Sequence, residues 1–159
     1  NHRLDPAVYE KKIIPQNGED QNLTHFAESL LSNIASEFDI VQGLLYVRKK
    51  ESDVFTIAGK YAYYGEQEPQ DFQLGVSLTG QTAKNQRVLR LSKIPENYIT
   101  VLSGLGSSAP NSLMLIPVIH QEKTIGLIEL AAFKNFDRST EDLFNQLSES
   151  IANKISELS

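Results

Sequence analysis

The sequence predicts an α+β domain built around an antiparallel sheet that is covered on both faces. Residues 113–119 and 124–132 are apolar runs on either side of a polar turn at 120–123, a pattern typical of a β-hairpin. Apolar residues occupy nearly every position of both runs, so each face of this hairpin must be buried. Helical periodicity precedes and follows the strands, and loop-rich segments remain for the second cover. A cover made of loops leaves room for a small molecule.

Two long amphipathic helices are expected. The first spans residues 23–38, with Asp20 or Asn22 as its N-cap, and has apolar residues at positions 23, 26, 27, 30, 31, 34, 35 and 38. The second follows Asp137 or Ser139 as its N-cap and has apolar residues at 143, 144, 147, 151, 155 and 158. No Gly or Pro ends it, so we expect it to continue in a longer protein. Residues 1–19 are expected to be a linker or N-terminal arm with one helical turn near 8–13, and residues 20–159 the domain itself.

The remaining elements are shorter. Strands are expected at 40–47 and 54–64 as a second hairpin, and at 72–76 and 87–91. Residues 78–85 are expected to form a short helix capped by Ser77, and residues 95–99 to begin another. The segment 103–110 is expected to be a loop. Pro117 cannot donate a ladder hydrogen bond and requires an edge or a bulge, while Gly126 indicates a bulge or a close backbone approach.

Composition excludes several classes of function. The net charge is −5, which argues against a nucleic-acid surface, and residues 48–50, the longest basic run, are interpreted as a solvated turn. The chain has no cysteine, so disulfides and thiol chemistry are excluded, and a reducing compartment such as the cytoplasm is expected. No apolar run is long enough to span a membrane. The three histidines have no metal-ligand spacing, and neither a phosphate-binding motif nor a nucleophile motif occurs, so we expect no metal and no catalytic residue.

Glu129 is the most informative carboxylate, because it lies between Ile128 and Leu130 in a strand without other charges. Burying a carboxylate is costly unless it meets a donor or a wet cavity. Two interpretations stay open: a pocket residue that binds a polar ligand group, or a side chain paired with a neighbouring strand or loop. Tyrosines at 46, 61, 63, 64 and 98 could line a ligand wall or be ordinary half-buried sheet residues.

Several motifs, in this order, resemble the GAF domain, especially the GAF modules of bacterial sensor histidine kinases and related signalling proteins. They are Gly75-x-x-Leu78-x-Gly80, Ile116-Pro117-Val118, Ile125-Gly126-x-x-Glu129-Leu130 and Phe136 with Leu143-Phe144 and Leu147. The resemblance covers about residues 23–155. It implies a central antiparallel sheet of five or six strands, with the first and last helices on one face. Short helices and loops, with residues 78–101 as a lid, would enclose a small-molecule pocket on the other face.

The resemblance implies a non-catalytic, small-molecule-sensing module that acts on an output domain of the same chain through its terminal helices. The ligand-binding residues are then expected at Tyr46, Tyr61, Leu78, Thr79, Tyr98, Ser103, Met114 and Glu129. The ligand and any cofactor stay unknown. The alternative is a ligand-free dimerisation and relay module, a homodimer paired through Leu147, Ile151, Ile155 and Leu158.

Three departures narrow the expected function. Residues 135, 136, 141 and 142 only partly match the N-K…F-x-x-x-D-E motif of cyclic-nucleotide GAF domains, which argues against that ligand. Bilin-binding relatives usually attach their pigment through cysteine, and methionine-sulfoxide-reducing relatives use cysteine nucleophiles. Because this chain has no cysteine, the resemblance points to the regulatory branch.

Overall fold

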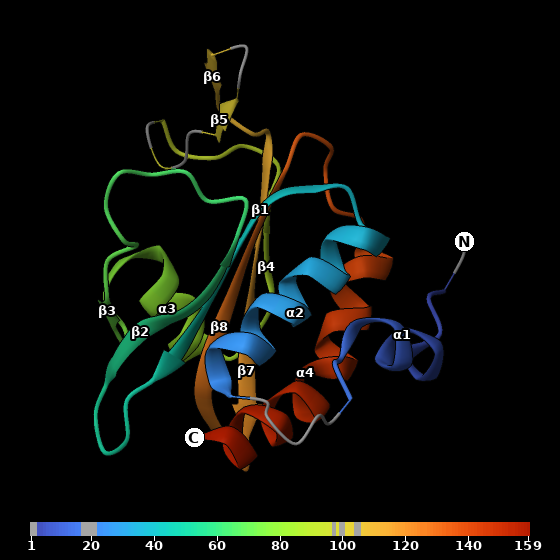
Figure 1. Ribbon diagram of the computed structural model, residues 1–159, viewed down its shortest axis with the longest axis vertical. Helices are drawn as coiled ribbons and strands as arrows, with labels where there is room; N and C mark the ends of the chain where they lie inside the picture. Colours follow the sequence, from blue (N-terminus) through green and yellow to red (C-terminus); the bar gives the residue numbers. More distant parts are fainter. Residues whose placement is uncertain (1–2, 17–21, 97, 99–100, 104–105) are drawn as a thin grey trace.

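The computed structural model describes residues 3–16, 22–96, 98, 101–103 and 106–159. A six-stranded antiparallel sheet, in the order β3-β2-β1-β8-β7-β4, separates α1, α2 and α4 from α3 (Figure 1). The elements are α1 (Pro6–Ile13), α2 (Leu23–Glu37), β1 (Ile40–Arg48), β2 (Val54–Tyr61), β3 (Phe72–Gln73), α3 (Ser77–Asn85), β4 (Leu89–Leu91), β5 (Val101–Ser103), β6 (Gly106–Ser108), β7 (Ser112–His120), β8 (Lys123–Ala132) and α4 (Arg138–Leu158). The predicted α+β class and the predicted strand number are confirmed.

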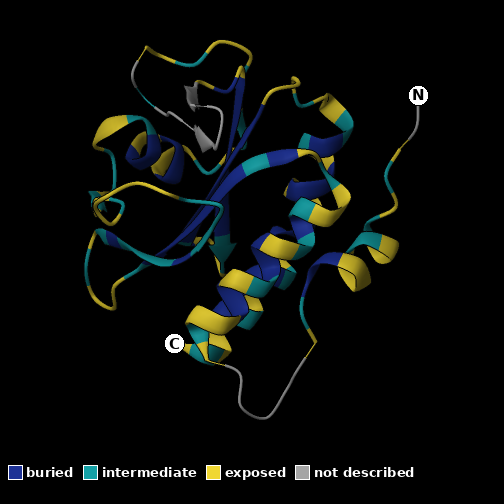
Figure 2. Cartoon of the chain, turned by 45° about the horizontal axis from the view of Figure 1, so that its top comes forward, coloured by how far each residue is buried: buried dark blue, intermediate teal, exposed yellow. Residues whose placement is uncertain are grey.

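Each face of the sheet has its own buried apolar cluster, because side chains alternate along each strand. On β8, Ile128 and Leu130 belong to the cluster that contains α2 and α4, whereas Leu127 and Ala131 belong to the opposite cluster. We call the cover of this second face the roof: α3, residues 62–71 and 92–96, and Tyr98. Both sides of the sheet are therefore buried, as the apolar runs predicted, and Figure 2 shows the dark central strands.

Side-chain caps begin both long helices. The side chain of Asn22 accepts a hydrogen bond from the backbone N–H of His25 and begins α2. The other candidate, Asp20, lies outside the described residues. For α4, Asp137 Oδ1 accepts hydrogen bonds from both the backbone N–H and the hydroxyl of Thr140, at 2.8 and 2.9 Å. These bonds stabilise the charged form, the backbone bond most strongly, and lower the pKa of Asp137.

The N-terminal segment holds more structure than the expected single turn. Asp5 caps α1, Pro6 occupies the first helical position, and α1 contacts both α2 and α4. Ile13 and Ile14 are buried in the cluster on that face. The division of the chain at residue 19 stays a prediction, and these contacts attach residues 6–14 to the folded core.

The β7–β8 hairpin closes more tightly than expected. His120 pairs with Lys123, so the turn consists of Gln121 and Glu122, and both have positive φ angles, 49° and 67°. The predicted bulge occurs beside Gly126, where the register shifts between Val118 and Ile119. A Cβ atom at Gly126 would also lie 3.0 Å from the carbonyl oxygen of Tyr46.

Pro117 lies where β7 has an edge, as predicted. The neighbouring strand β4 pairs with β7 only between Leu113 and Leu115. Beyond that point, Ser148 of α4 takes the place of a strand. Its hydroxyl donates to the carbonyl oxygen of Pro117 and accepts from the backbone N–H of Ile119, each at 3.1 Å. The missing N–H of Pro117 therefore leaves no ladder bond unmade.

Three local predictions are wrong. The segment expected to be a loop at 103–110 contains β6, which pairs with β5 as a separate two-stranded ribbon. Residues 95, 96 and 98 are not helical, and the rest of that expected helix lies at positions 97 and 99, outside the described residues. Ser77 does not cap α3 with its side chain; it adopts φ 67° inside the first turn, and Val76 precedes it without a side-chain cap.

The expected dimer face of α4 is turned into the protein's own core. Leu147, Ile151 and Ile155 are at most 1% exposed, and Leu158 packs against the same cluster. Their spacing arises because α4 lies along the sheet beside α2, not because a second copy pairs with it. The structure therefore does not offer these residues for dimerisation.

Candidate functional site

Glu129 is the buried charge around which the candidate site forms. It lies on β8, and its alternation with Ile128 and Leu130 directs it to the roof side. Its exposed fraction is only 5%, because β8 is a central strand with β1 and β7 on either side and the roof covers this face. A carboxyl group in this setting must be neutral or meet strong donors.

Tyr98 of the roof supplies one donor. Its hydroxyl donates to Glu129 Oε1 at 2.9 Å, the one hydrogen bond that the Glu129 side chain makes within the described part of the chain. Burial raises the pKa of Glu129 to about 7, and the bond from Tyr98 offsets a part of that rise. Burial, with the charge of Glu129 next in size, raises the pKa of both Tyr46 and Tyr98. Both phenols therefore stay protonated and can act as hydrogen-bond donors at neutral pH.

A pocket of about 330 Å³ opens beside this pair. Its volume is at the lower end of the range for small-molecule sites, roughly 300–1,000 Å³. The lining combines aromatic rings, amides, hydroxyls and two carboxylates. Its residues are Gln42, Leu44, Tyr46, Tyr63, Pro69, Gln70, Asp71, Phe72, Ser77, Thr79, Tyr98 and Glu129.

Both interpretations of Glu129 meet in this geometry. The side chain is paired with a loop residue, Tyr98, and it also lines the pocket. The second carboxylate oxygen accepts no hydrogen bond from any described residue. A ligand group could therefore bind Glu129 without displacing Tyr98.

The structure brings together four of the expected ligand-binding residues: Tyr46, Thr79, Tyr98 and Glu129 all line the pocket. Leu78 packs against the roof-side cluster but borders a different hollow, of about 550 Å³, between α3, β4 and α4. Ser103 belongs to β5, and its side chain lies outside what the structure describes.

Two expected residues lie on the wrong face. Met114 belongs to the cluster under α2 and α4, because its neighbours Leu113 and Leu115 take the roof side. Tyr61 also packs against the helix-side cluster; it pairs with Gly43 one position away from the roof-facing Lys60–Leu44 pair. We leave both residues out of the site.

Sequence reasoning missed several lining residues. Gln42 had a usable signal: it is polar in an apolar strand and lies at even spacing from Tyr46, so it shares the face of Tyr46. Gln70 and Asp71 lie in the irregular segment before β3. Such a segment has no periodicity from which the direction of a side chain could be predicted.

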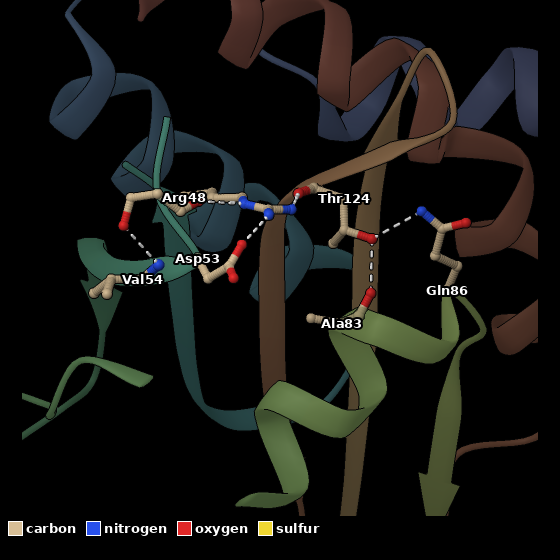
Figure 3. Close-up of polar contacts among 7 residues, drawn as sticks. Arg48, Asp53, Val54, Ala83, Gln86 and Thr124 are labelled. Carbon is tan, nitrogen blue, oxygen red and sulfur yellow. Dashed lines mark hydrogen bonds and ion pairs between the residues drawn. The ribbon is translucent and has the colours of Figure 1, made fainter. Parts of the chain in front are cut away.

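Arg48, which we expected to be solvated, forms a cluster that anchors the roof helix (Figure 3). Its side chain is 12% exposed, pairs with Asp53, and donates to the carbonyl oxygens of Ser52 and Thr124. The hydroxyl of Thr124 in turn donates to the carbonyl oxygen of Ala83 at 2.7 Å and accepts from Gln86 at 3.1 Å. Hydrogen bonds thus connect the end of α3 through β8 to the end of β1.

Other classes of site have no support in the described ranges. There, no group of three or more His, Cys, Asp or Glu side chains is placed to hold a metal ion. His25 is exposed and His120 half-buried. Within the same ranges, no helix combines the length and the apolar character that crossing a membrane requires.

The fold and the site together define a small α+β domain with a polar pocket between a sheet and its roof. The chain belongs to the GAF family: the family model described as GAF domain matches residues 20–156. The expected resemblance is thereby confirmed, and with it a fold used in regulation and signalling. No curated protein matches the chain.

Solved structures show the same fold at low identity. The GAF domain of a phosphoenolpyruvate-protein phosphotransferase from Acinetobacter has a TM-score of 0.75 and 14% identity, over 96% of this chain and 93% of that one. The nlh2 GAF domain of A. aeolicus, in an inactive state, has a TM-score of 0.69 and 15% identity, with the same coverages of 96% and 93%. The free methionine-R-sulfoxide reductase of Neisseria meningitidis, solved with its substrate, has a TM-score of 0.70 and 14% identity over 99% and 94%. The fold therefore occurs in regulatory domains and in enzymes.

Proposed function

We propose that this domain is a non-catalytic regulatory module of a bacterial signalling protein, such as a cytoplasmic sensor histidine kinase of a two-component system. A small molecule would bind between the sheet and the roof, and the terminal helices would pass the change to an output domain. One observation carries the proposal: a buried carboxylate on the central strand β8 is bonded to roof residue Tyr98 at the wall of a pocket. A purely structural sheet has no need of a buried carboxylate.

The contact between Tyr98 and Glu129 gives a ligand a way to act. A ligand shifts a conformational equilibrium only if it binds two states with different affinity. A ligand that contacts Glu129 and the roof together would bind better to the state in which the roof is closed on the sheet. The position of the roof is then linked to pocket occupancy.

The polar cluster around Arg48 supports a route by which a conformational change at the pocket could be passed towards α4. Roof helix α3 is bonded to Thr124, and Thr124 is bonded to Arg48. Arg48 borders a hollow of about 630 Å³ that Ile155 and Ser156 of α4 also line. A displacement of α3 could therefore be passed along these hydrogen bonds to the wall of a hollow that the C-terminal end of α4 also lines.

The comparison with the sulfoxide reductases leaves an enzymatic alternative, which the residues of this chain do not favour. None of its 159 residues is a cysteine, so it cannot supply a thiol nucleophile. The described pocket holds carboxylates and phenols. We expect no reduction of free methionine sulfoxide when the protein is supplied with a thiol reductant, and measurable turnover would contradict the non-catalytic proposal.

A screen by thermal unfolding tests ligand binding directly. A compound that binds only the folded state at 100 times its Kd stabilises the protein by about 2.7 kcal/mol. A library of neutral, anionic and cationic metabolites should contain compounds that raise the Tm of the wild type. These compounds should lose their effect when Thr79→Leu narrows the pocket, but not when Thr24→Leu alters an exposed position of α2. If no compound of any charge raises the Tm, the sensing proposal fails.

A further inference from the structure

We propose that the pocket takes a small organic cation, one that carries a primary ammonium or an amidinium group. The inference rests on the proposed function and adds the chemical class of the ligand. Its basis is the combination of two carboxylates with four aromatic rings at one small pocket whose described lining contains no basic side chain.

The charges around the pocket are unbalanced. Glu129 and Asp71 both line it, and neither forms an ion pair with any described residue. Lys60, which pairs with the roof-facing Leu44 across the sheet, is a cation on this face. Its ammonium is already paired with Glu68 and lies 5.7 Å from the centre of the Tyr63 ring. Lys60 therefore neutralises Glu68 and leaves the two lining carboxylates for a ligand.

The aromatic part of the lining suits a cation as well. Tyr46 and Phe72 meet edge to face, with ring centres 5.0 Å apart at 73°, and form a corner of the pocket. Phe55 stacks behind Phe72 at 4.7 Å and holds that ring in place. Aromatic faces attract ammonium and guanidinium groups within about 6 Å of the ring centre, most strongly where water is excluded.

Hydrogen bonding points the same way. Tyr98 occupies Glu129 Oε1, and no described residue donates to the other oxygen of Glu129. An N–H group of the ligand would supply that donor. An anionic ligand, by contrast, would face two carboxylates without a counter-charge, which opposes its binding. A neutral donor could form a hydrogen bond to a carboxylate, but it would lack the attraction between opposite charges that a cation adds.

Matched probes separate the three charge classes on one skeleton. Phenethylamine, 2-phenylethanol and phenylacetate differ chiefly in the charged or neutral end group and are of a size for a pocket of about 330 Å³. Their dissociation constants would be measured at pH 8 by ¹H–¹⁵N chemical-shift titration of the whole chain, with butylamine and agmatine as aliphatic cations. We expect at least one amine to bind about tenfold or more tightly than its alcohol and carboxylate counterparts.

Variants locate the binding. Glu129→Gln keeps the shape and the bond from Tyr98 but removes the charge, and should weaken amine binding about tenfold to hundredfold. Asp71→Asn, at an exposed position, should weaken it less and leaves the folded core untouched, so it carries the test if Glu129→Gln does not fold. Glu66→Gln is the matched control: it lies in the same segment, is exposed and does not line the pocket. It should leave the affinity unchanged.

The outcomes distinguish the two proposals. If the alcohol or the carboxylate binds as tightly as the amine, or if the amine affinity survives both Glu129→Gln and Asp71→Asn, the cation inference is overturned while ligand sensing stands. The same holds if the library yields only anionic or neutral hits. If neither the library nor the probes bind, both proposals fall.

Discussion

Glu129 couples the stability of the domain to pH. Its pKa in the folded protein is about 7, above the usual 4.5. The folded state therefore holds the proton more tightly, so this contribution is fully present below pH 4.5 and is lost as the pH rises to about 7. The phenols of Tyr46 and Tyr98 and the carboxyl of Asp71 surround it, and both phenols stay neutral over this window.

Replacing Glu129 by glutamine should remove that dependence. Glu129→Gln cannot ionise, so at pH 8 we expect it to exceed the wild type in free energy of unfolding, by as much as about 3 kcal/mol. At pH 4 the two proteins should differ little. Urea unfolding at several pH values measures this, with Glu66→Gln as the exposed control. A constant difference between wild type and variant from pH 4 to pH 8 would contradict the argument.

Arg48 should stabilise the domain mainly through the hydrogen bonds that it donates to two backbone carbonyl groups, rather than through its ion pair with Asp53. Removing the guanidinium leaves the carbonyl oxygens of Ser52 and Thr124 without their donor. We expect Arg48→Ala to lower the free energy of unfolding by about 1–3 kcal/mol, and Arg48→Lys to recover only a part of this, because an ammonium cannot reach both carbonyls in a fork. Lys49→Ala, at an exposed neighbour, should change it by less than about 0.5 kcal/mol. Equal losses in free energy of unfolding for Arg48→Ala and Lys49→Ala would contradict a stabilising role of the Arg48 hydrogen bonds.

At the scale of elements, α3 depends on a close approach to β3. A Cβ atom at Gly80 would lie 2.2 Å from the carbonyl oxygen of Gln73, and the Gly80 carbonyl accepts from the N–H of Gly75 at 2.8 Å. The contact is with backbone, so a side chain cannot rotate away to relieve it. This is the physical reason for the Gly75-x-x-Leu78-x-Gly80 spacing.

Gly80→Ala should therefore push the roof helix away from the sheet. We expect a loss of about 1–3 kcal/mol in the free energy of unfolding and weaker binding of any pocket ligand. Gln81→Ala, at an exposed site on the same helix, should be neutral or slightly stabilising, because alanine favours helices. Thermal unfolding of the two variants compares them. An unchanged Tm for Gly80→Ala would mean that α3 docks less tightly than the structure shows.

Elements with a strong period were predictable, and irregular ones were not. The spacing of apolar residues predicted α2 and α4, and uninterrupted apolar runs predicted β7 and β8. The segment that holds β6 is rich in Gly and Ser, residues that favour turns, so local propensity predicted a loop. Ser77 looked like a cap by residue type, yet its backbone adopts a positive φ that nothing in the sequence indicates.

For the whole molecule, the layered arrangement followed from the family resemblance, whereas the direction of individual side chains followed from strand alternation. Alternation could have placed Met114 on the helix side, because it differs in parity from its neighbours Leu113 and Leu115. Tyr61 was harder to place: a bulge between Leu45 and Tyr46 changes the pairing of β1 with β2. The contact from Tyr98 to Glu129 spans 31 residues and depends on the fold as a whole.

Because the apolar face of α4 is buried, a mutation designed to break a dimer through this face is expected to damage the core instead. Ile151 is fully buried, so Ile151→Glu places an unpaired charge in the core. We expect it to unfold the domain or to cost more than about 3 kcal/mol, rather than to convert a dimer into folded monomers. Asn153→Glu, at an exposed position of the same helix, should stay folded with the mass of the wild type. Circular dichroism and light scattering make the comparison. A folded Ile151→Glu protein with half the wild-type mass would instead support the hypothesis of a homodimer paired through α4.

Ser148 has a consequence for how α4 can move. One hydroxyl group serves both the carbonyl of Pro117 and the N–H of Ile119, at the stretch of β7 that β4 leaves uncovered. Sliding the helix along the strand, or rotating it about its axis, would break both hydrogen bonds. Tilting it about that point would not. We therefore expect α4 to tilt about Ser148 rather than to slide along β7, so that its two ends would swing in opposite directions about the contact beside Pro117.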